Sequence, residues 1–265
     1  MHRFNKMVSV KEIMSTDPLC IKEEDILTKA QSIMRETGYR SLPVTDEQCN
    51  RVTGILSRGD ALTVSSRKTN VEVRGVMNHN VVSTSPGEDI YVAARKLTDS
   101  RVRQLPVVDD EGRLEGMLSS MDVLAAFVDQ GYKTTKKTIS QVMNPDVIYC
   151  SEDDEVSRLW NIMEESGFGG LPVVDRKGKV KGMITRMDIL RKRSLHIGKE
   201  SGKKKKAQVK KAMTADPTTI KSDTETLKAA ILMVESKIIR LPVVDDKGKL
   251  VGIVDSEDIL RSYLS

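Results

Sequence analysis

Three glycines of the chain are each followed three residues later by a hydroxyl residue and six residues later by an aspartate. The pairs are Ser57 with Asp60, Ser119 with Asp122, and Thr185 with Asp188. A helix that begins at such a pair offers unsatisfied N–H groups and a positive dipole end, which favour a phosphate. The carboxylate can accept both hydroxyl hydrogens of a ribose diol. The motif therefore fits a nucleoside phosphate, although the same residues also form an ordinary helix N-cap.

Other site chemistries find little support in the composition. The cysteines and histidines are scattered, without CxxC or HxxxH spacing, and stand at Cys20, Cys49, Cys150, His2, His79 and His196. We expect neither a catalytic metal site nor a disulfide framework. Aromatic residues make up 3% of the chain, which disfavours base stacking on aromatic platforms. No apolar run approaches the length of a membrane span, and the first residues lack a signal-peptide core, so we expect a cytoplasmic protein with no membrane contact.

The net charge of +5 is concentrated in one segment. Residues 191–211 contain ten Lys or Arg and one Glu, so the rest of the chain has a net charge of −4. The run Lys203–Lys206 lies in a predicted basic linker, residues 195–206. A nucleic-acid-binding or scaffold protein acting through this linker is the alternative function, although charge runs are more often solvated surface.

Four repeats account for most of the sequence. Leu-Pro-Val occurs four times, with its proline at Pro43, Pro106, Pro172 and Pro242. Each proline has a methionine 29 residues before it and a glycine 10 or 11 residues after it, and an aspartate stands six residues beyond the glycine. The methionines and glycines are Met14, Met77, Met143 and Met213, and Gly54, Gly116, Gly182 and Gly252. Such a register indicates four copies of one structural unit.

Each repeat predicts the element order β-α-β-β-α, an α/β (α+β) fold. A Ser followed three residues later by an acid predicts the first helix start at Ser85, Ser151 and Ser222. Apolar residues at helical spacing then predict a core face, formed by Ile26, Ala30, Ile33, Met34, Ile90, Ala94 and Leu97. Leu-Pro-Val predicts a buried strand, the following acidic turn a hairpin, and the aspartate motif a second helix.

A single repeat is too small to be stable alone, so pairing is expected. We assign the repeats to residues 8–65, 71–128, 137–194 and 207–264, and divide the chain near residue 133 into two pseudo-twofold modules.

This pattern resembles the cystathionine β-synthase (CBS) domain, here in four copies that form two tandem pairs, or Bateman modules. The arrangement is similar to that of the regulatory γ subunit of AMP-activated protein kinase. The resemblance implies a non-catalytic sensor that binds an adenine nucleotide (AMP, ADP or ATP), or alternatively S-adenosylmethionine or a related nucleoside, and transmits occupancy to a regulated protein. It implies no catalytic cofactor. It also implies a flat disc, closed either within a monomer, which we favour, or by a homodimer.

The resemblance also implies specific ligand contacts in the first module. Polar contacts come from Arg40, Ser57, Arg58 and Asp60 in repeat one, and from Arg103, Ser119 and Asp122 in repeat two. The walls of the base slot are implied to be Ile13, Tyr39, Ile55, Val76, Val102 and Met117.

The second module departs from this pattern. Repeat three keeps Thr185, Arg186 and Asp188, but Gly169 and Gly170 replace the basic residue before Leu-Pro-Val. Repeat four keeps Asp258 but has Asp255 at the hydroxyl position, with Glu257 between them. Carboxylates repel a phosphate. We therefore expect that the fourth cleft holds no nucleotide phosphate and is empty, bridged by a metal, or used by an uncharged nucleoside.

Overall fold

The computed structural model describes residues 7–48, 50–63, 70–189 and 207–264. The chain divides into two units. Unit 1 comprises Met1–Thr135 together with Leu260–Ser265, and unit 2 comprises Lys136–Ile259. The predicted basic linker, including Lys203–Lys206, lies outside the described residues.

Unit 1 contains the first two repeats. Repeat one consists of α1 (Val10–Ile13), β1 (Ser15–Thr16), β2 (Ile21–Lys22), α2 (Leu27–Thr37), β3 (Ser41–Thr45), β4 (Val52–Ser57) and α3 (Arg58–Thr63). Repeat two consists of the short helix η1 (Val73–Gly75), α4 (Ile90–Asp99), β5 (Gln104–Val108), β6 (Leu114–Ser119) and α5 (Ser120–Asp129).

Unit 2 contains the other two repeats. Repeat three has η2 (Ile139–Gln141), β7 (Cys150–Ser151), α6 (Val156–Ser166), β8 (Gly170–Val174) and β9 (Val180–Thr185), and a further helix begins at Arg186. Repeat four has η3 (Val209–Lys211), β10 (Thr214–Ala215), β11 (Ile220–Lys221), α8 (Thr226–Ser236), β12 (Arg240–Val244), β13 (Leu250–Asp255) and α9 (Ser256–Leu264). The part of α9 from Leu260 onward belongs to unit 1. The predicted α/β class is confirmed. In repeat two the first strand is reduced to one bridge, between Thr84 and Val107.

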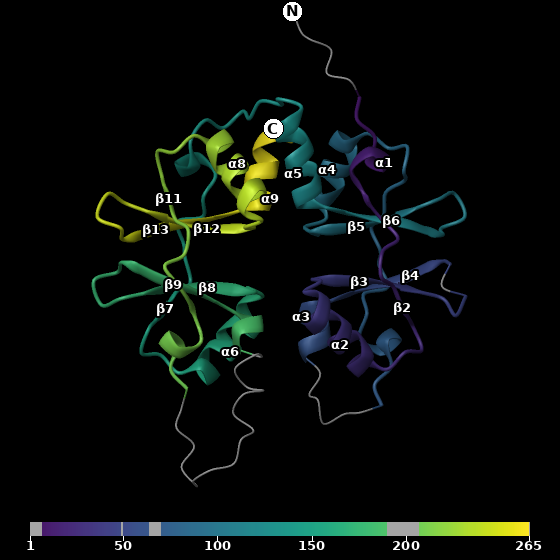
Figure 1. Ribbon diagram of the computed structural model, residues 1–265, viewed down its shortest axis with the longest axis horizontal. Coiled ribbons are helices and arrows are strands. Elements are labelled where there is room, and N and C mark those ends of the chain that lie inside the picture. The colour runs from purple at the N-terminus through teal and green to yellow at the C-terminus, as the bar shows by residue number, and fades with distance from the viewer. Residues whose placement is uncertain (1–6, 49, 64–69, 190–206, 265) are drawn as a thin grey trace, which may run out of the picture. The chain divides into compact units, whose positions relative to one another are not determined.

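Each repeat builds a small sheet around its Leu-Pro-Val hairpin. The sheet orders are β2-β3-β4 and β1-β6-β5 in unit 1, and β11-β12-β13 and β10-β9-β8-β7 in unit 2. Within unit 1, α4 and α5 lie beside β5 and β6, whereas α2 and α3 lie beside β3 and β4 (Figure 1). β1 belongs to repeat one but pairs with β6 of repeat two, and β10 of repeat four pairs likewise with β9 of repeat three. The repeats of a unit therefore exchange strands.

The repeated methionine and glycine meet across this exchange. A Cβ built on Gly116 would lie 2.8 Å from Sδ of Met14, and one built on Gly252 would lie 2.6 Å from Sδ of Met143. Met77 packs in the same way against Gly54, and Met213 against Gly182. Each methionine thus packs on the glycine of its partner repeat, so this contact joins two repeats.

The predicted starts of the first helices are wrong by several residues. Ser85 and Ser151 lie in turns ahead of the helices, where the N–H of the following acid donates to the serine carbonyl oxygen. The N-cap of α4 is Asp89, whose side chain accepts the N–H of Tyr91 at 2.7 Å. The N-cap of α8 is Glu225, three residues beyond Ser222. Ser85 and Ser151 each begin a turn whose last residue directly precedes the N-cap.

One residue of the predicted core faces is misplaced. Ile26 is the N-cap of α2 and is 47% exposed, while the next residue, Leu27, takes the core position. Ala30, Met34, Ala94 and Leu97 are buried as predicted.

Residues from Leu260 onward complete unit 1. Tyr263 is 4% exposed, and its ring centroid lies 5.3 Å from that of Phe127 in α5. Arg261 donates to the carbonyl oxygen of Thr98 at 3.0 Å, and Thr135 N–H donates to the carbonyl oxygen of Ser262 at 2.9 Å. A segment distant in sequence therefore covers α4 and α5.

Among the described residues, no helix combines the length and the apolar character that crossing a membrane requires.

Candidate ligand-binding site

The Gly-x-x-Ser/Thr-x-x-Asp motif has the same geometry in the three repeats that carry it. Ser119 donates its hydroxyl to Oδ2 of Asp122 at 2.7 Å, and the Asp122 N–H donates back to Ser119 Oγ at 3.2 Å. Ser57 with Asp60 and Thr185 with Asp188 repeat the arrangement. This reciprocal pair is a capping box, which fixes both side chains at the start of a helix. The helix cap and the proposed ligand contacts therefore use the same residues.

Two predicted phosphate contacts already have protein partners. The Arg58 guanidinium donates to the carbonyl oxygens of Gly38 and Tyr39, just after α2. Arg186 donates to the carbonyl oxygen of Met163, near the end of α6. Cations are favourable at helix C-termini, so both arginines have a structural role in their own repeat.

The residue three positions before each proline lies beside the start of the second helix. Arg58 N–H donates to the carbonyl oxygen of Arg40 at 2.8 Å, and Ser120 N–H donates to that of Arg103 at 2.9 Å. Arg40 and Tyr39 are exposed. The backbone therefore brings both predicted arginines next to the capping boxes.

The predicted base-slot residues of unit 1 differ in how far they are buried and in what they contact. Ile13 ends α1 and is half-buried, as is Val102. Val76 packs against the hydrophobic cluster of repeat one. Ile55 and Met117 pair with residues that follow the methionine of the opposite repeat, Asn78 and Ser15 respectively.

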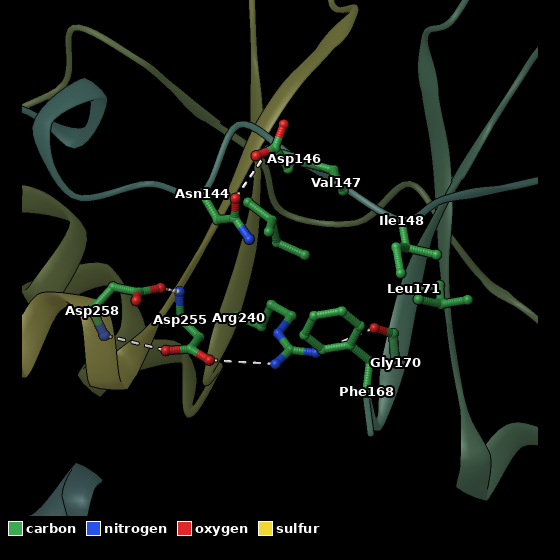
Figure 2. A pocket seen from close by; sticks show the side chains of 11 residues that line it. Asn144, Asp146, Val147, Ile148, Phe168, Gly170, Leu171, Arg240, Asp255 and Asp258 are labelled. Carbon is green, nitrogen blue, oxygen red and sulfur yellow. Dashed lines mark hydrogen bonds and ion pairs between the residues drawn. The ribbon is translucent and has the colours of Figure 1, made fainter. Parts of the chain in front are cut away.

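Unit 2 contains a cavity of about 150 Å³ between its two repeats (Figure 2). Repeat four contributes Arg240, Ile253, Asp255 and Asp258. Repeat three contributes Asn144, Asp146, Val147, Ile148, Phe168, Gly170 and Leu171. The lining thus joins a capping motif to an aromatic ring and aliphatic side chains of the partner repeat.

Arg240 organises the polar side of this cavity. Its Nη2 lies 3.3 Å from Oδ2 of Asp255, and both side chains are largely buried. Its Nη1 donates to the carbonyl oxygen of Gly170 at 3.2 Å, and its guanidinium carbon lies 5.6 Å from the centroid of the Phe168 ring. Figure 2 shows the guanidinium between Asp255 and Phe168. The positive charge of Arg240 is thus paired with a carboxylate and stacked on an aromatic face.

Asp258 has an unusual electrostatic environment. Burial, followed by the negative charge of Asp255, raises the pKa of the Asp258 carboxyl from 3.8 to about 7. Asp258 Oδ2 accepts the Asp255 N–H at 2.9 Å, and the Asp258 N–H donates to Asp255 Oδ1 at 3.2 Å. Asp255 therefore replaces the hydroxyl of the other three repeats without changing the capping geometry.

Several lining residues were missed by the sequence analysis. Phe168 stands four residues before its proline, as Tyr39 and Val102 do, so this spacing would have identified it. Arg240 stands two residues before its proline rather than three, so it does not share the spacing of Arg40 and Arg103. No spacing signal exists for Asn144 and Ile148, because they reach the cavity through the pairing of Asn144 with Ile253.

Within the described ranges there is no group of three or more His, Cys, Asp or Glu side chains suited to holding a metal ion.

A family model for the CBS domain matches residues 10–67, 73–129, 139–194 and 209–265. The chain belongs to the CBS-domain family. The four matched domains confirm the resemblance to the CBS domain that the four repeats indicate.

Two proteins of one archaeon are similar to this chain over most of its length. The uncharacterised protein MJ1404 of Methanocaldococcus jannaschii is 32% identical over 95% of this chain, which spans 61% of that protein. MJ1225 of the same organism is 26% identical over 98% of this chain and 99% of its own length. The crystal structure of MJ1225, proposed to be an archaeal homologue of γ-AMPK, superposes with a TM-score of 0.80 at 25% identity, covering 96% of this chain and 99% of that one.

Proposed function

We propose that this chain is a non-catalytic regulatory protein that binds an adenosine-containing ligand between the paired CBS domains of a unit and signals occupancy to another protein. The functional modules are residues 8–65 with 71–128, and residues 137–194 with 207–264. The cavity of unit 2, with a capping motif on one side and an aromatic ring on the other, carries this proposal.

The lining offers a contact for each part of a nucleoside. Asp258 stands at the start of α9, where an ionised carboxylate accepts the two hydroxyl hydrogens of a ribose. Phe168, Ile148 and Ile253 supply aromatic and aliphatic surface for the base. Apolar walls with a few fixed polar groups are typical of small-molecule sites.

In unit 1 the corresponding contacts are those expected from the sequence. Asp60 and Asp122 hold the ribose, while Ser57, Ser119, Arg40 and Arg103 face the phosphate. Tyr39 and Val102, with Ile55 and Met117, take the place of Phe168 and Ile253 at the base. We propose AMP, ADP or ATP as the ligand of this unit.

A regulatory role without chemistry is supported by the extent of the family match. The four CBS domains take up most of the chain. Where an enzyme is similar, the similarity is partial: inosine-5′-monophosphate dehydrogenase of M. jannaschii is 38% identical over 47% of this chain and 23% of the enzyme.

Calorimetric titration of the full chain tests the proposal. We expect adenosine to bind unit 2, and Asp258→Asn to weaken that event roughly 10- to 100-fold, the range for a lost hydrogen bond to a charged group. We expect Asp60→Ala with Asp122→Ala to weaken AMP binding in unit 1 by a similar factor.

The matched control is Asp223→Asn, at an exposed carboxylate of unit 2 that does not line the cavity. It should bind adenosine as the parent does. Equal affinity of the parent and Asp258→Asn for adenosine would disprove the ribose assignment.

A further inference from the structure

Repeat four differs from the other three at one position of the helix cap. Ser57, Ser119 and Thr185 place a neutral hydroxyl there, whereas Asp255 places a carboxylate. Asp255 Oδ1 accepts the N–H groups of Glu257 at 3.0 Å and of Asp258 at 3.2 Å. The first N–H groups of α9 are therefore already bonded to a negative charge and do not attract a second anion.

The guanidinium of Arg240 is also already bonded to protein groups. Of the described residues that line the cavity, Arg240 is the only cation, against the carboxylates of Asp146, Asp255 and Asp258. One of its nitrogens pairs with Asp255 and another with the carbonyl oxygen of Gly170. A phosphate entering this cavity has to compete with Asp255 for the charge of Arg240.

Arg240 contacts the partner repeat through the carbonyl oxygen of Gly170. Gly170 stands at the same distance from its proline as Arg240 does, and it has no side chain. In unit 1 the equivalent residues, Ser41 and Gln104, meet in a neutral hydrogen bond of 2.5 Å. The Gly170–Arg240–Asp255 arrangement is therefore specific to unit 2.

We propose that Asp255 is a specificity residue that makes the unit 2 cavity select an adenosine-type nucleoside lacking negative charge at its 5′ end. Asp255 neutralises Arg240 and occupies the helix start, so a phosphate meets no available positive group there and is repelled by carboxylates. This inference rests on the proposed function, because it specifies which adenosine ligand the cavity accepts.

Adenosine and AMP form a matched pair of probes, since they differ only in the phosphate. Each is titrated at pH 8 into the full-length parent, Asp255→Ser and Asp255→Asn. A binding event is assigned to this cavity when its heat of binding disappears in the Asp258→Asn variant. Asp255→Ser copies repeats one and two, and Asp255→Asn keeps an oxygen that caps α9 while removing the charge.

In the parent we expect adenosine to bind at least about tenfold more tightly than AMP. In both Asp255 variants the affinity for AMP should rise about tenfold or more over that of the parent. The affinity for adenosine should stay within about threefold of the parent value. Circular dichroism and the melting temperature establish that the variants are folded.

Equal affinity of the parent for the two probes overturns the inference while leaving the proposed function intact. So does an adenosine preference that persists in folded Asp255→Ser and Asp255→Asn. If neither probe binds this cavity in any of the three proteins, the proposed function fails at unit 2 and the specificity inference fails with it.

Discussion

At the scale of single residues, one capping geometry supports different electrostatics. In Ser119 and Asp122 the cap joins a hydroxyl to a carboxylate. In Asp255 and Asp258 it joins two carboxylates in a partly enclosed cavity, and only one of them is compensated by Arg240. The stability of unit 2 therefore depends on the protonation of Asp258.

This dependence has a definite sign. The pKa of Asp258 is raised from 3.8 to about 7, so the folded chain binds this proton more tightly than the unfolded chain. Stability from this group is present in full below pH 3.8 and is lost as the pH rises to about 7, by at most about 1.4 kcal/mol per pH unit. Asp258→Asn removes the titrating group and with it this loss. We therefore expect the free energy of unfolding of the variant to rise relative to that of the parent as the pH increases.

Urea unfolding between about pH 4 and pH 8, followed by Trp160 fluorescence, measures the difference. Trp160 is the only tryptophan of the chain and lies in α6 of unit 2. Asp223→Asn serves as the control and should track the parent. A stability difference between parent and Asp258→Asn that does not change with pH would contradict the raised pKa.

Residue-scale features were predictable where they are local. The capping pairs at Ser57, Ser119 and Thr185 follow from a spacing of three. The ion pair of Arg240 with Asp255 does not, because the residues stand on opposite strands of a hairpin and the stacking on Phe168 comes from another repeat. Contacts across repeats leave no signal in the spacing of a single repeat.

At the scale of elements, the strand exchange within a unit depends on glycine. A Cβ on Gly252 would meet mainly the Met143 side chain, with the nearest backbone oxygen, of Asn144, at 3.3 Å. A Cβ on Gly182 would meet Met213 and also the backbone oxygen of Thr214 at 2.9 Å. A methionine side chain can be removed, whereas a backbone oxygen cannot.

We therefore expect Gly252→Ala and Gly182→Ala each to cost about 1–3 kcal/mol. Combining Gly252→Ala with Met143→Ala should cost at least about 1 kcal/mol less than the sum of the single changes. Gly182→Ala with Met213→Ala should show a smaller rescue. Urea unfolding read by Trp160 measures all of these.

The mismatched pair Gly252→Ala with Met213→Ala is the control, and its costs should add within about 0.5 kcal/mol. If the stability costs of Gly252→Ala and Met143→Ala also add in the double variant, the methionine does not limit the space at Gly252.

The order of elements was predictable because hairpins and helices are encoded locally. Pro106 and Gly112 mark the β5–β6 hairpin by themselves. The pairing of β1 with β6 was not predicted, since β1 has only two residues and joins a sheet of the next repeat. The methionine register pointed to a repeat, but not to the glycine on which each methionine packs.

At the scale of the whole molecule, unit 1 is completed by residues that follow unit 2 in sequence. Tyr263 is buried against Phe127, burial raises its pKa to about 12, and its hydroxyl has no hydrogen-bond partner among the described residues. The ring therefore contributes packing, while the buried hydroxyl contributes little or opposes it.

We expect Tyr263→Phe to leave the stability of unit 1 unchanged or slightly higher, and Tyr263→Ala to lower it by about 3–5 kcal/mol. Thermal and urea unfolding followed by circular dichroism measure both changes in the full chain. A large loss in Tyr263→Phe would indicate a hydrogen bond to the phenol, and no loss in Tyr263→Ala would rule out the packing role.

The division of unit 1 also sets an order during synthesis. Residues 1–135 leave the ribosome first, yet the segment that covers Phe127 follows only after unit 2 has been made. At typical elongation rates this interval is on the order of ten seconds. During that time the α4–α5 surface is open to the Leu260–Leu264 segment of a finished neighbouring chain. Translation on crowded polysomes should therefore favour exchange of this segment between copies.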